Sequence, residues 1–84
     1  MTKDKALIIQ DRINDATENA YKETAVIAEI GEKAENDFRV DVSQDIFNVG
    51  DSFHKMEMIA DIARELSVHT YAVIEDGTIH VKLF

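Results

Sequence analysis

The stretch HTYAVIEDGTIHVKLF, residues 69–84, decides much of the fold. Two runs in which apolar and polar residues alternate flank the pair Asp76-Gly77, which strongly favours a two-residue type I′ turn. With that pair as the loop, Glu75 lies opposite Thr78, and every later pairing is fixed. The sequence therefore predicts an antiparallel β-hairpin in one defined register.

The two faces of this hairpin differ in character. The face predicted to meet the core carries Val68, Ala72, Ile74, Ile79, Val81 and Leu83. The other face carries His69, Tyr71, Val73, His80, Lys82 and Phe84. Its apolar members form a patch, so we expect a partner or another segment of the chain to cover it.

A strand and a helix are expected before the hairpin. FRVDV, residues 38–42, alternates apolar and charged residues as a half-buried strand does, and a turn is predicted at 43–45. Asp51 is the predicted N-cap of the following helix. The apolar stripe of that helix contains Phe53, Met56, Ile59, Ala60, Ala63 and Leu66.

Residues 6–35 show a helical period. Apolar residues recur there at alternating spacings of three and four, at Ala6, Ile9, Ile13, Ala16, Ala20, Ile27, Ile30 and Ala34. Thr2 is the expected N-cap. A gap in the stripe at 23–24 leaves two geometries, one long rod or a helical hairpin that folds near 19–24. That region has neither glycine nor proline, which favours the rod.

A rod of about 45 Å would extend beyond a domain of this size. We therefore predict a homo-oligomer that shares the apolar stripe between copies. The predicted oligomer seam contains Ile9, Ile13, Ala16, Ala20 and Ile27.

These elements predict the α+β class, in a single domain that spans residues 1–84. Residues 1–36 would form the long amphipathic helix, and residues 37–84 a β-α-β-β unit with a small antiparallel sheet of about three strands. No apolar run reaches membrane-spanning length, and the start of the chain is too polar for a signal peptide, so we expect a cytoplasmic protein.

The sequence offers little for catalysis or for cofactors. The three glycines stand apart, so there is no glycine-rich phosphate loop, and there is no cysteine. Ser67 and His69 lack a carboxylate placed to orient the histidine. We expect no enzyme activity, no cofactor and no bound metal.

Charge is the strongest bulk signal, because 17 acidic residues face nine basic ones and give a formal net charge of −8. Such a field repels nucleic acid and anionic membranes and attracts basic surfaces. Glu35, Asp37, Asp41 and Asp45 follow one another along a helix end, a strand and a turn. They are the predicted contacts for the basic surface of another protein, for which a nucleic-acid-binding protein is one candidate.

The sequence has VSQDIF before a predicted helix and VHTY in a predicted strand. In general character, this order resembles that of the uracil-DNA glycosylase inhibitors, which are short, acidic, phage-encoded mimics of DNA. The long N-terminal helix and the missing acidic-serine strand motif depart from that family. The resemblance implies an inhibitor or modulator, and it assigns no residue a role.

Two other functions stay open. One is an oligomeric binder of a small, nucleotide-like ligand in a pocket between protomers. Its candidate contacts are Tyr21, Lys22, His69, Tyr71 and Lys82, because the few cations must meet an anionic ligand. The other is a structural assembly subunit built on the helical seam.

Overall fold

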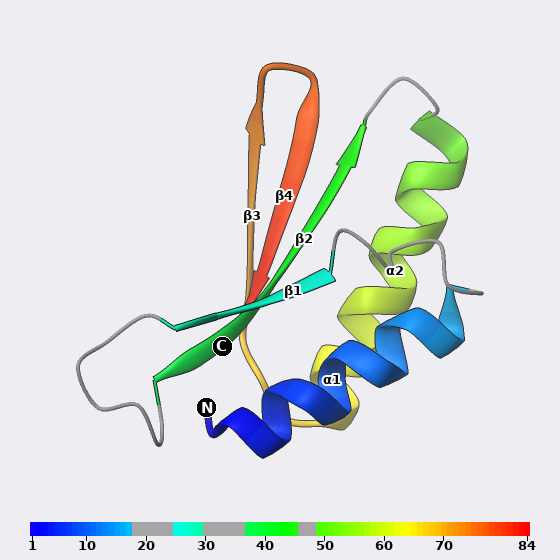
Figure 1. The fold of residues 1–84 in the computed structure, drawn as a ribbon. Coiled ribbons are helices and arrows are strands. Elements are labelled where there is room, and N and C mark those ends of the chain that lie inside the picture. Colours follow the sequence, from blue (N-terminus) through cyan, green and yellow to red (C-terminus); the bar gives the residue numbers. More distant parts are fainter. Residues whose placement is uncertain (18–24, 30–36, 46–48) are drawn as a thin grey trace.

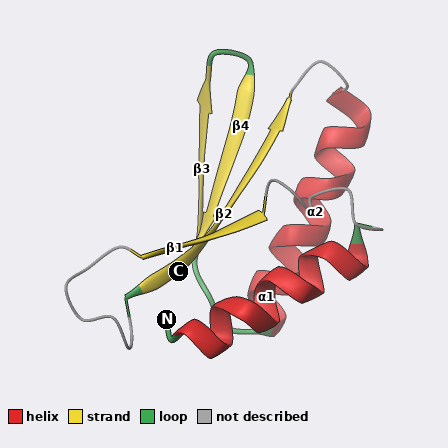
Figure 2. Cartoon of the chain, viewed as in Figure 1, coloured by secondary structure: helices red, strands yellow, loops and turns green. Residues whose placement is uncertain are grey.

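The computed structural model describes residues 1–17, 25–29, 37–45 and 49–84. Along the chain these residues form α1 (Lys3–Ala16), β1 (Ala25–Glu29), β2 (Phe38–Asp45), α2 (Val49–Glu65), β3 (Thr70–Glu75) and β4 (Thr78–Leu83). The strands make one antiparallel sheet in the order β1-β2-β4-β3, and both helices lie against the same face of it (Figures 1 and 2). The predicted α+β class is confirmed.

The C-terminal hairpin has the predicted register. Glu75 pairs with Thr78, and the pairing runs on to Thr70 with Leu83. Asp76 and Gly77 adopt positive φ angles of 50° and 75°, as a type I′ turn requires. The turn chemistry alone was therefore sufficient to place both strands.

The predicted core face of the hairpin is correct for β4 only. Ile79, Val81 and Leu83 are buried, whereas Ala72 is exposed and Ile74 is 69% exposed. The strand order gives the reason, because α1 packs over β1 and β2, and the helix layer stops short of β3 at the far edge of the sheet.

The predicted long helix is wrong in its second half. Helix α1 ends at Ala16, and Ala25–Glu29 form a strand at the opposite edge of the sheet from β3. The hydroxyl and the N–H of Thr17 both donate to the carbonyl of Ile13, at 2.6 Å and 3.0 Å, which closes the last turn. The sheet consequently has four strands, one more than expected.

Helix α1 packs on its own molecule. Thr2 is the N-cap, as predicted, with its hydroxyl accepting from the N–H of Lys5 at 3.2 Å. The side-chain amide of Gln10 donates to the Ala25 carbonyl at 2.7 Å, which ties the helix to β1. The shared core contains Ala6, Ile9, Ile13, Ala25, Phe38, Val40, Val42, Ile59, Ile62, Ala63, Ile79, Val81 and Leu83.

Two further boundaries differ from the sequence predictions. Residues 43–45 continue β2 because they pair with His80, Ile79 and Thr78 of β4, so they are not a turn. Helix α2 begins at Val49, so Asp51 lies within the helix and is not its N-cap. Pairing with β4 therefore extended β2 beyond its local sequence signal.

Candidate functional site

The four carboxylates predicted to bind a partner do not form one described cluster. Glu35 and the side chain of Asp45 lie outside the described residues, and Asp37 is half-buried. Asp41 Oδ1 lies 2.8 Å from Arg39 Nε, in an ion pair that is not aligned as a hydrogen bond. Lys82 is the β4 neighbour of Asp41, so a second cationic residue lies on the same face of the sheet.

The predicted oligomer seam is divided between two elements of the same fold. Ile9 and Ile13 are fully buried against the other elements of their own chain, and Ala16 packs at the edge of that core. Ile27 lies in β1, and Ala20 is outside the described residues. The rod that supported the oligomer prediction is therefore absent, and oligomerisation needs another interface.

Three of the five alternative ligand contacts come together. His69, Tyr71 and Lys82 share the sheet face that the helices leave uncovered, and Tyr71 pairs directly with Lys82 across the hairpin. The ring of His69 lies 6.0 Å from that of Phe84, which is 47% exposed. Tyr21 and Lys22 lie outside the described residues.

The same uncovered face holds one serine–histidine contact. Ser43 Oγ and His80 Nδ1 are 3.0 Å apart and partly buried, and they are neighbours in the β2–β4 ladder. Among the hydrogen bonds of the described residues, none joins this histidine to a carboxylate, and none joins Ser67 to His69. The contact fixes the orientation of both side chains within the sheet.

Helix α1 presents an outward face that combines carboxylates with exposed apolar side chains. Asp4, Asp11 and Asp15 are exposed, as are Leu7 at 42% and Ile8 at 53%. Positions 4, 8, 11 and 15 fall on one helical stripe. We refer to Asp4, Leu7, Ile8, Asp11 and Asp15 as the α1 outer face. The sequence prediction did not identify this face, although the spacing of Leu7 and Ile8 from the aspartates is that of one solvent-facing side of a helix.

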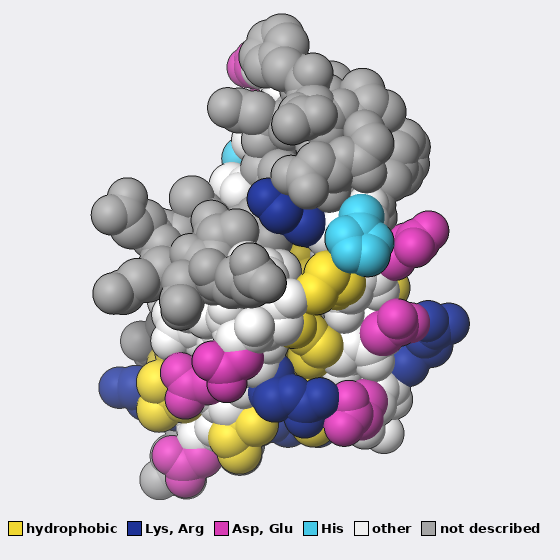
Figure 3. Space-filling model, turned by 90° about the vertical axis from the view of Figure 1, so that its right-hand side faces the viewer, with side chains coloured by type: hydrophobic (Ala, Val, Ile, Leu, Met, Phe, Trp, Pro, Cys, Tyr) yellow, Lys and Arg dark blue, Asp and Glu magenta, His cyan; other side chains and the backbone are white. Residues whose placement is uncertain are grey.

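Helix α2 adds exposed charges beside α1. Glu65 accepts from the guanidinium of Arg12 at 2.5 Å, which links the two helices, and Asp61 pairs with Arg64 one turn away. Glu57 is exposed on the same helix. Figure 3 looks onto the helix layer and shows acidic side chains spread over it, with basic side chains among them.

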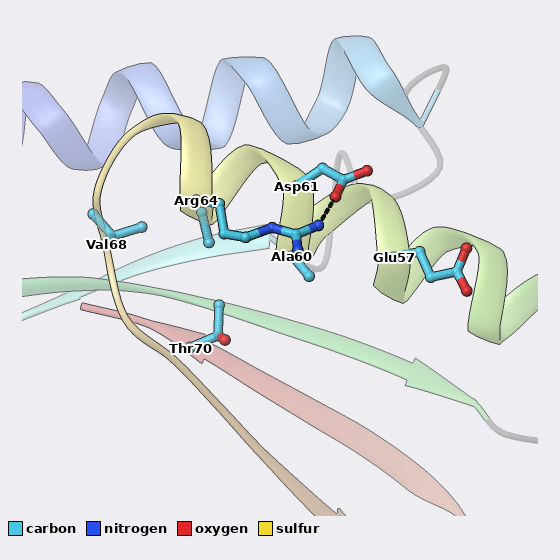
Figure 4. A pocket seen from close by; sticks show the side chains of 7 residues that line it. Glu57, Ala60, Asp61, Arg64, Val68 and Thr70 are labelled. Atoms are coloured by element: carbon cyan, nitrogen blue, oxygen red, sulfur yellow. Dashed lines mark hydrogen bonds and ion pairs between the residues drawn. The ribbon is translucent and has the colours of Figure 1, made fainter.

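A groove of about 470 Å³ separates the end of α2 from β3 (Figure 4). Its lining combines Ala60, Ala63 and Val68 with charged residues of α2, and Thr70 closes it on the strand side. A smaller hollow of about 80 Å³ continues along β3 beside Ala72. Both lie where the helix layer stops short of the edge strand.

Neither a metal cluster nor a membrane-spanning helix is found in the described part of the chain. No group of three or more histidine, aspartate or glutamate side chains there could hold a metal ion. No helix there is long and apolar enough to cross a membrane.

Comparison with known proteins finds no matching family model, no matching curated protein and no matching solved structure.

Proposed function

We propose that this protein is a non-enzymatic interaction domain that binds the basic surface of another protein and modulates that protein's activity. The supporting observation is the α1 outer face, where three exposed carboxylates surround two exposed apolar side chains. A formal net charge of −8 extends the attraction beyond direct contact. Such a field accelerates association with a positively charged partner and disfavours acidic partners.

The α1 outer face matches the chemistry of a lysine- or arginine-rich surface. Asp4 and Asp11 are seven residues apart, which is about 10.5 Å along the helix axis, and Asp15 follows one turn later. Ile8 lies between them, where the aliphatic stem of a lysine or arginine can pack while its charged end reaches a carboxylate. A protein that binds nucleic acid has lysine and arginine side chains placed to meet successive phosphates, and such side chains could also meet the successive carboxylates of the α1 outer face.

The test replaces carboxylates at two places with the same change in charge. The α1 variant is Asp4→Asn/Asp11→Asn/Asp15→Asn, and the matched control is Glu57→Gln/Asp61→Asn/Asp76→Asn. Each raises the formal net charge from −8 to −5, because three carboxylates are replaced. Immobilised wild-type protein and both variants are used to capture partners from a lysate, and bound proteins are eluted with salt.

We expect the α1 variant to lose a basic protein that both the wild type and the control retain at low salt. If both variants lose the bound protein equally, binding depends on net charge alone and not on the α1 outer face. Equal retention by both would reject the α1 outer face as the binding surface.

A nucleotide-like ligand is the second candidate, because His69, Tyr71 and Lys82 lie together on the uncovered sheet face. Such a ligand would combine stacking on an aromatic ring with a contact between its phosphate and Lys82. Thermal unfolding with a panel of nucleotides tests this function. A rise of several degrees that disappears in Lys82→Gln supports it, and no rise with any nucleotide rejects it.

A further inference from the structure

The two edges of the sheet are not equally protected. Edge strand β1 contacts α1, and the side-chain amide of Gln10 donates a hydrogen bond to the carbonyl of Ala25. Edge strand β3 has the sequence TYAVIE, with no lysine or proline to prevent further pairing and with one charged residue, Glu75, at its end. Natural proteins use those residues, bulges or covering elements to block exposed edges. An edge strand without them is suited to accept another strand.

The hydrogen bonds of the hairpin identify which groups of β3 point outward. His69 and Phe84 exchange both backbone bonds, with the His69 N–H donating at 2.8 Å and the Phe84 N–H at 3.0 Å. Because antiparallel ladders alternate, the N–H and C=O groups of Tyr71, Val73 and Glu75 also point toward β4. Those of Thr70, Ala72 and Ile74 point away from the sheet.

We propose that β3 pairs with β3 of a second copy of this chain, antiparallel about a two-fold axis at Ala72. The outward groups are symmetric about this residue, so Ala72 pairs with the partner's Ala72, and Thr70 with the partner's Ile74. Each of these pairs exchanges two backbone hydrogen bonds, and the two sheets join with all helices on one side. This inference is independent of the proposed function, because it uses a different surface.

The side chains in this register are complementary. On the uncovered face, Tyr71 lies opposite the partner's Val73, and His69 opposite the partner's Glu75, giving an aromatic–β-branched pair and a pair that can form a hydrogen bond. On the helix side, Ile74, which is 69% exposed, lies opposite the partner's Thr70. Because Thr70 lines the groove of Figure 4, Ile74 stands at the mouth of the other copy's groove.

Charge opposes this dimer, because each copy carries a net charge of −8. Salt screens that repulsion and leaves the hydrogen bonds and apolar contacts in place. The dimer should therefore strengthen as salt increases, whereas the proposed binding of a basic partner should weaken. The opposite salt responses distinguish failure of one proposal from failure of the other.

The experiment measures the molar mass of the full chain by light scattering at about 100 µM protein and about 0.3 M salt. The wild type should have twice the 9.5 kDa mass of one chain. Ala72→Pro removes an outward N–H without removing a bond to β4, and it should raise the dissociation constant about tenfold or more. Ile74→Lys should also give monomers, whereas Ile8→Lys, the same change at an exposed isoleucine of α1, should stay dimeric.

Circular dichroism establishes that each variant is folded, and Ala72→Cys tests the register. The chain has no cysteine, and paired Ala72 positions in this register are about 5.5 Å apart, within the range for a disulfide. Mild oxidation should give a covalent dimer from Ala72→Cys and not from Ile8→Cys. A monomeric wild type, a dimer that persists in both Ala72→Pro and Ile74→Lys, or no cross-link through Ala72→Cys would overturn the proposal.

Discussion

Replacing Ile9 by alanine should destabilise the protein strongly, whereas the same replacement at Ile8 should have little effect. Ile9 is fully buried in the core that α1 shares with the sheet, and Ile8, about 100° further round the helix, is 53% exposed. The two residues are adjacent and chemically identical. The pair therefore isolates the contribution of burial from that of helix propensity.

The expected magnitudes follow from burial. Truncating a fully buried isoleucine to alanine costs about 2–5 kcal/mol, from lost transfer free energy and the cavity that remains. A domain of this size is stable by about 4–13 kcal/mol, so Ile9→Ala removes a large share of the free energy of unfolding. Ile8→Ala should change it by less than about 0.5 kcal/mol, because alanine also favours the helix.

Urea unfolding followed by circular dichroism measures both variants against the wild type. Relative to the wild type, Ile9→Ala should have a much lower urea midpoint and Ile8→Ala a nearly unchanged one. The slopes of the three unfolding transitions should be similar. If the two variants are destabilised equally, or if Ile9→Ala costs less than about 1 kcal/mol, α1 does not pack on the sheet as described.

Three further changes test particular contacts by the same unfolding measurement. Gly77→Ala should cost about 1 kcal/mol or more, because φ at this position is 75° and a Cβ atom disfavours it; an unchanged midpoint would contradict the type I′ turn. Thr2→Ala should cost about 1 kcal/mol, because the side-chain cap on the N–H of Lys5 is lost. Thr2→Ser keeps a hydroxyl acceptor, so it should retain most of the wild-type stability. Gln10→Ala should cost about 0.5–1.5 kcal/mol, because the Ala25 carbonyl loses its side-chain partner; hydrogen exchange that stays unchanged in β1 would argue against this contact.

The hairpin could be predicted in detail because its information is local. Asp76 and Gly77 select the turn, and the turn fixes the register of both strands. The exposure of Ile74 could not be predicted in the same way, because it depends on strand order and on how far α2 extends over the sheet. Alternation identifies two faces of a strand, and only the complete fold determines how deeply each is buried.

The N-terminal half shows why periodicity can mislead. Spacings of three and four continue from Ile13 to Ile27, which belongs to another element. Ala25–Glu29 has the sequence AVIAE, a short run without the apolar–polar alternation that would have identified a strand. The first turn was predicted correctly because Thr2 is a cap with a definite chemical role. The α1 outer face could not be predicted from the apolar stripe, because Leu7 and Ile8 are apolar but exposed, and only the packing of the complete fold determines that.

The most direct test of the central claim is the affinity of a captured basic partner for the two charge-matched triple variants. We predict that Asp4→Asn/Asp11→Asn/Asp15→Asn binds at least about tenfold more weakly than Glu57→Gln/Asp61→Asn/Asp76→Asn at about 50 mM salt. This difference should shrink toward about 500 mM salt, where exposed charges are screened. Equal affinities for the two variants at low salt, or binding to the wild type that is independent of salt, would contradict this claim.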